Sequence, residues 1–308
     1  MREVLTYPVR DIVPYINWVY FFHAWGMEPR FAAVAHIHDC SACRAEWIAS
    51  FNEAERAKAQ EAISLYQEAM GYLRRWADKP ACRALFLLAD AYSDGDDIVV
   101  DGQVRIPFLR QQHAGKSGYT LCLSDFIAPR GCLSSASADI SNRIGVFVTT
   151  VSVDCFCDDG SVDGSSDTSL STLITSTLTD RLAEATAEKM HEEVRKHYWG
   201  YAKDERLTMA ELHAERFQGI RPAVGYPSLP DQSIHFLIDE LLHMSDVGVR
   251  LSDTGAMIPQ CSVSGFMFAH PRAQYFAVGP IGEDQLMDYS CRRAFSADTL
   301  RSFLTSNL

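Results

Sequence analysis

The sequence predicts an α+β fold, because segments with helical periodicity and segments of β-strand character both recur along its 308 residues. The strongest helical segment is 170–197, where apolar residues return every three or four positions. A second helix is predicted at 52–76, closed by a Lys-Pro pair. The clearest strands form a predicted hairpin, in which the β-branched runs 98–100 and 104–106 flank an Asp-Gly turn.

The other elements follow from the same two periodicities. Further strands are expected at 84–91, 143–153, 263–268 and 275–278. The last two alternate like paired strands joined by a His-Pro-Arg turn. Shorter helices are expected at 208–217, 233–245, 283–293 and 296–304. The first of these begins with a capping box, since Glu211 follows Thr208 by three positions. The segment 154–169 is predicted to be a solvated loop, because its aspartates lack the closing Glu of a calcium loop.

Composition places the chain among globular proteins. Hydrophobic residues make up 47% and charged residues 22%, which excludes a disordered or fibrous chain. The formal net charge of −12 argues against general binding to nucleic acid, whose phosphates it would repel. No stretch suits a membrane span, no signal peptide is visible, and nine cysteines in a chain of this length suit reduced thiols. We therefore expect a cytoplasmic protein with neither a nucleic-acid nor a membrane partner.

Motifs of several common chemistries are missing from the sequence. It contains neither a Gly-x-Gly-x-x-Gly loop nor a Gly-Lys-Ser/Thr phosphate loop, which argues against a Rossmann dehydrogenase or methyltransferase. A Gly-x-Ser-x-Gly elbow is also missing.

One compact cluster unites His36, His38, Cys40 and Cys43. On a helix, His36, Cys40 and Cys43 would share one face and could hold a soft metal. The two cysteines alone could form a dithiol. Because the spacing fits neither a zinc finger nor a redox motif on a βαβ unit, we expect an ordinary helical surface there. No metal is expected among the functional residues, and a metal or redox protein built on this cluster is kept as an alternative.

The most distinctive string is 218–231, Gln-Gly-Ile-Arg-Pro-Ala-Val-Gly-Tyr-Pro-Ser-Leu-Pro-Asp. Its two glycines and three prolines prescribe an irregular, rigid backbone. The guanidinium of Arg221, held on such a backbone, is a preorganised donor for a carboxylate or a planar ring. Exposed backbone beside Ala223 and Gly225 leaves room for a flat ligand. The alternative is a tight turn between domains that binds nothing.

The Arg-x-x-x-Gly-Tyr pattern at 221–226 resembles the signature of the S-adenosylmethionine-binding reactivation domain of cobalamin-dependent methionine synthase. Other segments are similar to that family in order and kind, so that the resemblance covers nearly the whole chain: 15–18, 109–112, 121–129, 194–201, 207–219, 262–271 and 274–278. The segment 36–46 is the least similar.

The resemblance implies one domain, 1–308, with a curved, twisted and mostly antiparallel sheet flanked by helices. In the family this domain is the last module of a longer enzyme, so the chain resembles a free-standing version. The implied function is a stand-alone reactivation subunit, which binds S-adenosylmethionine and presents its methyl group for reductive methylation of cob(II)alamin. The cobalamin would be held by a truncated methionine synthase or another corrinoid protein, and the electron would come from a flavodoxin-like donor.

Such a chain is expected to be a component of the methyltransferase activity that serves methionine biosynthesis, and not a complete enzyme by itself. No catalytic residue is expected, since the sulfonium is already activated and the protein contributes binding and position.

The resemblance also implies which residues bind the ligand. Arg221 would bind the methionine carboxylate, where a fork of donors suits two oxygens. Ala223, Gly225 and Tyr226 would contribute backbone and ring contacts around the nucleoside.

Four further positions complete the implied site. Tyr275 and Phe276 match a pair of aromatic residues beside the ligand, and Glu215 matches a carboxylate near the site. Asn17 stands where the family has an Asp that meets the ligand's ammonium.

The chain departs from the family pattern at three places. Loss of the Asp charge at Asn17 is expected to cost about 1 kcal/mol of binding free energy or somewhat more, which is about tenfold in affinity. The run 232–235 replaces the family's His-Thr-Glu-Lys, and Phe276 lacks the hydroxyl of the family's Tyr. These departures leave open an alternative, a corrinoid-protein docking subunit that has lost the use of S-adenosylmethionine.

Overall fold

The chain forms two compact units, each assembled from separate stretches of sequence. The computed structural model describes residues 1–114, 118–131, 140–156 and 168–304. One unit combines Met1–Leu5, Ala84–Thr150 and Ala187–Leu308, and the other combines Thr6–Arg83 and Val151–Thr186. The expectation of one domain over 1–308 stays a prediction. No helix among the described residues is both long enough and apolar enough to cross a membrane.

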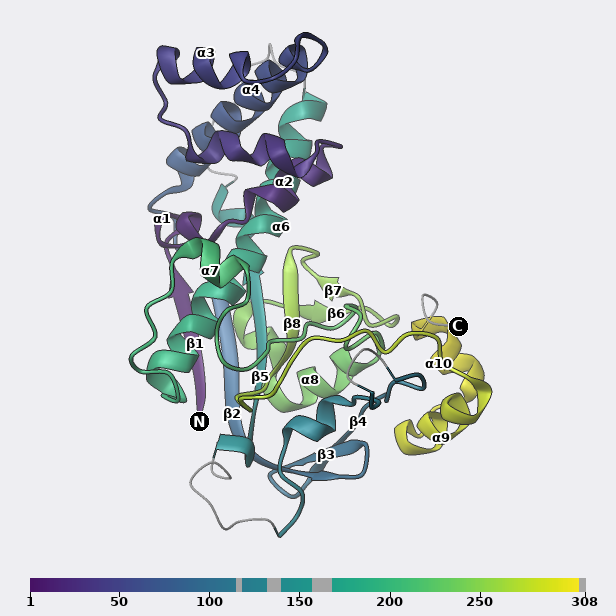
Figure 1. Cartoon of the computed structure of the whole chain (residues 1–308). Coiled ribbons are helices and arrows are strands. Elements are labelled where there is room, and N and C mark those ends of the chain that lie inside the picture. Colours follow the sequence, from purple (N-terminus) through teal and green to yellow (C-terminus); the bar gives the residue numbers. More distant parts are fainter. Residues whose placement is uncertain (115–117, 132–139, 157–167, 305–308) are drawn as a thin grey trace. The chain divides into compact units, whose positions relative to one another are not determined.

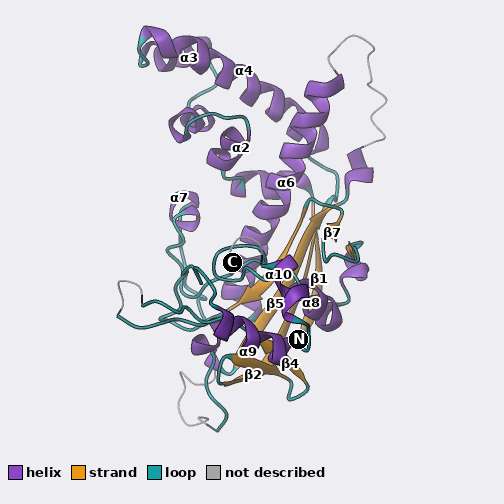
Figure 2. Cartoon of the chain, turned by 90° about the vertical axis from the view of Figure 1, so that its right-hand side faces the viewer, coloured by secondary structure: helices purple, strands orange, loops and turns teal. Residues whose placement is uncertain are grey.

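The first unit is built on a sheet whose strand order is β4-β3-β2-β5-β8, with β1 also paired to β2. Figure 2 draws the strands in orange. The strands are β1 Arg2–Tyr7, β2 Cys82–Asp94, β3 Asp97–Val100, β4 Val104–Pro107, β5 Arg143–Val151 and β8 Ser262–Met267. The pairs β2–β3, β3–β4 and β5–β8 are antiparallel. A separate antiparallel pair joins β6 Arg250–Leu251 to β7 Met257–Ile258. The α+β prediction with a mostly antiparallel sheet is thus confirmed, as is the hairpin at 98–106.

Short helices and turns complete this unit. They are the 3₁₀ turn Leu123–Phe126, the π-helical turn Val194–Tyr198, α7 Met209–His213, α8 Ile234–Leu242, the 3₁₀ turn Met244–Val247, α9 Glu283–Arg293 and α10 Ala297–Phe303. Apolar side chains of the sheet share one core with α8, whose Ile234, Ile238 and Leu242 are fully buried. A smaller core joins α9 and α10 through Leu286 and Leu300.

The second unit is helical (Figure 1). Its elements are α1 Val9–Ile12, the 3₁₀ turn Val13–Tyr15, α2 Trp18–Ala24, the 3₁₀ stretch Pro29–His36, α3 Ser41–Ala49, α4 Glu53–Trp76 and the 3₁₀ turn Val153–Phe156. Helix α4 confirms the helix predicted at 52–76. Asn52 caps it, since its side-chain oxygen accepts a hydrogen bond from the Glu55 N–H at 3.1 Å. The long helix α6, Thr168–Glu193, contributes its first part to this unit.

Three predictions about local structure need correction or fall partly outside the described residues. The α-helix predicted at 170–197 ends at Glu193. The next five residues, Val194–Tyr198, form a wider π-helical turn. His36, Cys40 and Cys43 do not share a helix face, since the 3₁₀ stretch ends at His36 and α3 begins only at Ser41. Most of the loop predicted at 154–169 lies outside the described residues.

Candidate functional site

The segment that carries Arg221 runs alongside the edge strand β8. Antiparallel bridges join Ile220 to Phe268 and Ala223 to Gly265, so Arg221 is fastened on both sides. Ile220 and Phe268 exchange two backbone hydrogen bonds of 2.9 Å. The rigid backbone predicted for 218–231 is therefore anchored to the sheet.

Two glycines allow this close approach. A Cβ atom on Gly265 would lie 2.2 Å from the carbonyl oxygen of Pro222, and one on Gly219 would lie 2.2 Å from that of Phe268. Neither oxygen can move without breaking the strand contact. Sequence analysis did not single out Gly265, although a glycine inside a predicted strand is a signal of close backbone approach.

The Arg221 side chain is held inside the unit and is only 7% exposed. Its Nη2 donates to Oε1 of Glu188 at 2.5 Å, and its guanidinium carbon lies 5.5 Å from the centre of the Phe147 ring. Its backbone N–H donates to the hydroxyl of Tyr275 at 2.9 Å. Glu188 and Phe147 thus contact the guanidinium, while Tyr275 holds the backbone of the same residue.

Tyr275 belongs to a segment that sequence analysis placed wrongly. The segments 263–268 and 275–278 are not paired strands, because β8 pairs with β5 on one side and receives the Arg221 segment on the other. Residues 275–278 instead bond to the turn after Arg221. The N–H of Val278 donates to the oxygen of Pro227 at 2.9 Å. Although 38% of the surface of Tyr275 is exposed, enclosure of its hydroxyl end raises its pKa to about 12.

Two carboxylates and a buried imidazole surround the guanidinium. Glu188 and His191 lie one turn apart on α6. The Oε2 atom of Glu188 is buried without a hydrogen-bond partner among the described residues. Partial desolvation, and then the negative charge of Glu188, raises the pKa of the Glu215 carboxyl. Complete burial, followed by the positive charges of Arg195 and Arg221, holds the pKa of His191 well below 6.5. Sequence analysis missed Glu188 and His191, whose only signal is their shared face on a predicted helix.

The remaining predicted ligand residues are spread around this centre. Ala223 is buried beside β8, whereas Tyr226 is 53% exposed in a turn where the Gly225 N–H donates to the Leu229 oxygen at 2.8 Å. Gly225 has a φ of 89°, which favours glycine.

Two predicted residues have other local contacts. Phe276 packs against the cores, with its ring 6.5 Å from that of Phe126. Asn17 belongs to the helical unit, where its side-chain oxygen caps α2 by accepting from the Val19 N–H at 3.1 Å. Their contacts with a ligand stay predictions.

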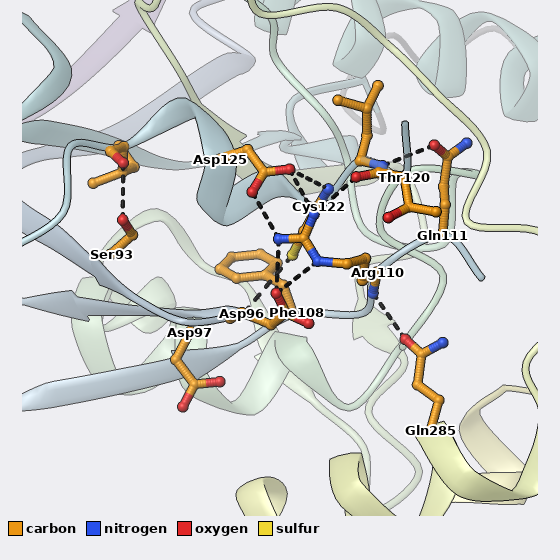
Figure 3. Close-up of polar contacts among 12 residues, drawn as sticks. Ser93, Asp96, Asp97, Phe108, Arg110, Gln111, Thr120, Cys122, Asp125 and Gln285 are labelled. Carbon is orange, nitrogen blue, oxygen red and sulfur yellow. Dashed lines mark hydrogen bonds and ion pairs between the residues drawn. The ribbon is translucent and has the colours of Figure 1, made fainter. Parts of the chain in front are cut away.

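Figure 3 shows a network of hydrogen bonds and ion pairs around Arg110. The guanidinium of Arg110 donates to Asp96 at 2.8 Å and to both oxygens of Asp125 at 2.7 and 2.8 Å. The neighbouring Gln111 donates from Nε2 to the oxygen of Ala277 at 2.8 Å. The bond from Gln111 thus ties the motif 109–112 to the segment that carries Tyr275.

The arrangement is suited to binding rather than to proton transfer. The guanidinium of Arg221 can receive a carboxylate, since charge-assisted forked hydrogen bonds favour two oxygens. The nearby carboxylates of Glu188 and Glu215 favour a cationic group in the same ligand. A ligand with the head group of an α-amino acid satisfies both requirements.

Comparison with known proteins identifies the family of the chain. Residues 8–294 match the family described as "Vitamin B12 dependent methionine synthase, activation domain". Among solved structures, the chain is similar to the MetH reactivation domain bound to AdoHcy. The two share 31% sequence identity and a TM-score of 0.80, over 100% of this chain and 90% of the other. The chain therefore belongs to the family of vitamin B12-dependent methionine synthase activation domains.

Proposed function

We propose that this chain binds S-adenosylmethionine at Arg221 and presents the methyl group to cob(II)alamin held by a partner protein. The observation that carries the proposal is the buried guanidinium, fastened between two bridges to β8. The similar reactivation domain bound to AdoHcy supports the ligand class. AdoHcy is the compound that remains when S-adenosylmethionine has given up its methyl group.

The residues of the site have separate tasks in this proposal. Arg221 binds the methionine carboxylate, while Ala223, Gly225 and Tyr226 line the nucleoside. Tyr275 holds the Arg221 backbone in place through its hydroxyl.

The ammonium needs an acceptor in the unit that carries Arg221. We propose that Oε2 of Glu188, which has no hydrogen-bond partner among the described residues, accepts from the ammonium. This oxygen lies beside the Arg221 guanidinium, because Oε1 of the same carboxylate accepts from Arg221. Glu215 adds negative charge near a ligand that carries both an ammonium and a sulfonium.

The reaction that this chain serves is a reductive methylation. One electron from a flavodoxin-like donor and the methyl cation of S-adenosylmethionine convert cob(II)alamin to methylcobalamin and leave AdoHcy. The chain's own contribution is to hold the sulfonium in one orientation, since positioning alone removes much of the entropic barrier. The chain is thus proposed as a stand-alone subunit of cytoplasmic methionine synthase activity, with the corrinoid on a truncated methionine synthase or another corrinoid protein.

Titration calorimetry with S-adenosylmethionine tests the binding step. The Arg221→Lys variant keeps the charge but loses the fork, so its affinity should fall at least about tenfold. Arg272→Gln, which changes an exposed arginine in the same unit, should bind as the wild type does. If the wild type shows no binding at millimolar ligand, or if Arg221→Lys binds equally well, the proposal is wrong.

A second candidate function is a docking subunit for a corrinoid protein that no longer uses S-adenosylmethionine. Asn17 and Gln232 favour it, because Asn17 lacks the charge of the family's Asp and Gln232 begins a run that departs from the family's His-Thr-Glu-Lys. A cob(II)alamin methylation assay with a partner and an electron donor separates the two. Binding to the partner without methylation, in both the wild type and Asn17→Asp, would support the docking subunit.

A further inference from the structure

A cluster of metal-ligand side chains lies in the helical unit, outside the site at Arg221. His38, Cys40 and Cys43 each offer one ligand atom, and these atoms lie within 4.8 Å of one another. We propose that these three side chains bind one Zn²⁺ ion and leave a fourth coordination position to water or an external ligand. The proposal is independent of S-adenosylmethionine binding.

The backbone around the cluster already has the shape that such a site needs. The Cys40 N–H donates to the oxygen of His38 at 2.9 Å, and across this tight turn a ring nitrogen of His38 lies within 4.8 Å of both sulfur atoms. Asp39 is anchored at the turn, since its Oδ1 accepts from Arg44 at 2.8 Å and from Gln67 at 3.3 Å. The ligands are therefore presented from a turn held to both α3 and α4.

The sulfur atom of Cys40 is in an environment that favours thiolate. The Sγ of Cys40 is the N-cap of α3 and accepts a hydrogen bond from the Cys43 N–H at 3.3 Å. Backbone N–H groups at a helix start stabilise negative charge. Thiolate is the form of cysteine that binds metal.

The distances and the ligand types point to zinc. Tetrahedral bonds of about 2.3 Å to sulfur and 2.0–2.1 Å to nitrogen place the ligand atoms about 3.5–3.8 Å apart. The ligand atoms now lie within 4.8 Å of one another, so side-chain rotations that move them by about 1 Å bring them to these distances. Two thiolates and an imidazole are soft and borderline ligands that suit Zn²⁺, and three protein ligands plus an open position occur in catalytic zinc sites.

The cluster can bind and lose an ion without loss of the fold. Helix α3 has no buried residue, and His38 is exposed. Substitutions at the ligands should therefore leave the folded protein intact. The same two thiols could instead form a Cys40–Cys43 disulfide, and the experiment must separate these two outcomes.

The test uses the full chain purified without an affinity tag, in reductant, and then dialysed against Zn²⁺. Elemental analysis should find one zinc per chain. Replacing zinc by Co²⁺ should produce the thiolate-to-cobalt charge-transfer band and the intense visible bands of tetrahedral coordination. Cys40→Ser and His38→Gln should each weaken Zn²⁺ binding at least about a hundredfold, measured by competition with a chromophoric chelator.

Two matched controls keep the test specific. His36→Gln changes the neighbouring imidazole outside the cluster, and Cys291→Ser removes an exposed free thiol of the other unit. Both should retain stoichiometric zinc and the cobalt spectrum. The proposal is overturned if zinc stays substoichiometric or survives Cys40→Ser. It is also overturned if the reduced protein ignores Zn²⁺ and forms a Cys40–Cys43 disulfide on mild oxidation.

Discussion

Replacement of Gly265 by alanine should displace the segment that holds Arg221. The added Cβ would lie 2.2 Å from the oxygen of Pro222 and 2.8 Å from the Cα of Ala223, and both are backbone atoms. A flexible side chain could rotate away, but a backbone fastened by neighbouring bridges cannot. The segment must therefore shift away from β8, together with the guanidinium.

The expected cost combines overpacking with weakened hydrogen bonds. Forced overpacking of a well-packed site costs about 1–3 kcal/mol of the free energy of unfolding. Two flanking bonds would lengthen, from the Phe266 N–H to Pro222 at 3.1 Å and from the Val224 N–H to Ser264 at 2.9 Å. Each is worth about 1 kcal/mol when intact. Since both bonds are weakened and not abolished, we expect a total loss of about 2–4 kcal/mol.

Urea unfolding followed by circular dichroism measures this loss, and calorimetry measures the accompanying fall in S-adenosylmethionine affinity. The matched control is Gly71→Ala, because no atom lies within 4 Å of its added Cβ. Gly71 lies inside α4, where alanine should stabilise by about 0.5–1 kcal/mol. If Gly265→Ala unfolds at the wild-type urea concentration and binds the ligand with wild-type affinity, close packing against β8 does not hold Arg221.

Three other predictions concern single side chains. Asn17→Asp should raise S-adenosylmethionine affinity about tenfold in calorimetry, and an unchanged affinity would remove Asn17 from the ammonium site. The folded-state pKa of His191 lies below 6.5, so the unfolded chain binds the extra proton and stability falls as the pH drops below that value. The free energy of unfolding of the wild type should fall by up to about 1.4 kcal/mol per pH unit, and that of His191→Phe should fall less steeply. Equal slopes for the two proteins, measured by urea unfolding at pH 5 to 7, would contradict the assignment. Arg110→Lys should lower the free energy of unfolding by about 1 kcal/mol, because an ammonium cannot make the forked contact with Asp125. A wild-type urea midpoint would show that this partly exposed pair contributes little.

The sequence predicts those elements whose causes are local. Helix α4 follows from a capping Asn52, a run of apolar residues at helical spacing and a closing proline, all of which act within one segment. The hairpin at 98–106 follows for the same reason, since the turn and both strands are adjacent in the chain. The capping box at Thr208 and Glu211 is likewise confirmed.

The site was predicted only in part, because its contacts are tertiary. Arg221 was identified from the glycines and prolines of 218–231, which prescribe an unusual backbone within one segment. Its ion pair with Glu188 depends on which face of α6 meets the signature segment, and no local pattern encodes that choice. The strand pairing of 275–278 failed similarly, because the segment's polar groups are satisfied by the turn after Arg221. The His-Cys cluster was assigned to a helix face, since the sequence does not show the break between His36 and Ser41.

The contacts that hold Arg221 also determine at what stage of its synthesis the chain can first bind the proposed ligand. Glu188 precedes Arg221 by 33 positions, whereas Tyr275 follows it by 54. During synthesis the guanidinium therefore emerges before the hydroxyl that holds its backbone, and it cannot be fully oriented until the chain has been made past that tyrosine. Ligand capture thus depends on long-range closure, so S-adenosylmethionine should protect the complete fold while leaving nascent or C-terminally truncated chains open to proteases.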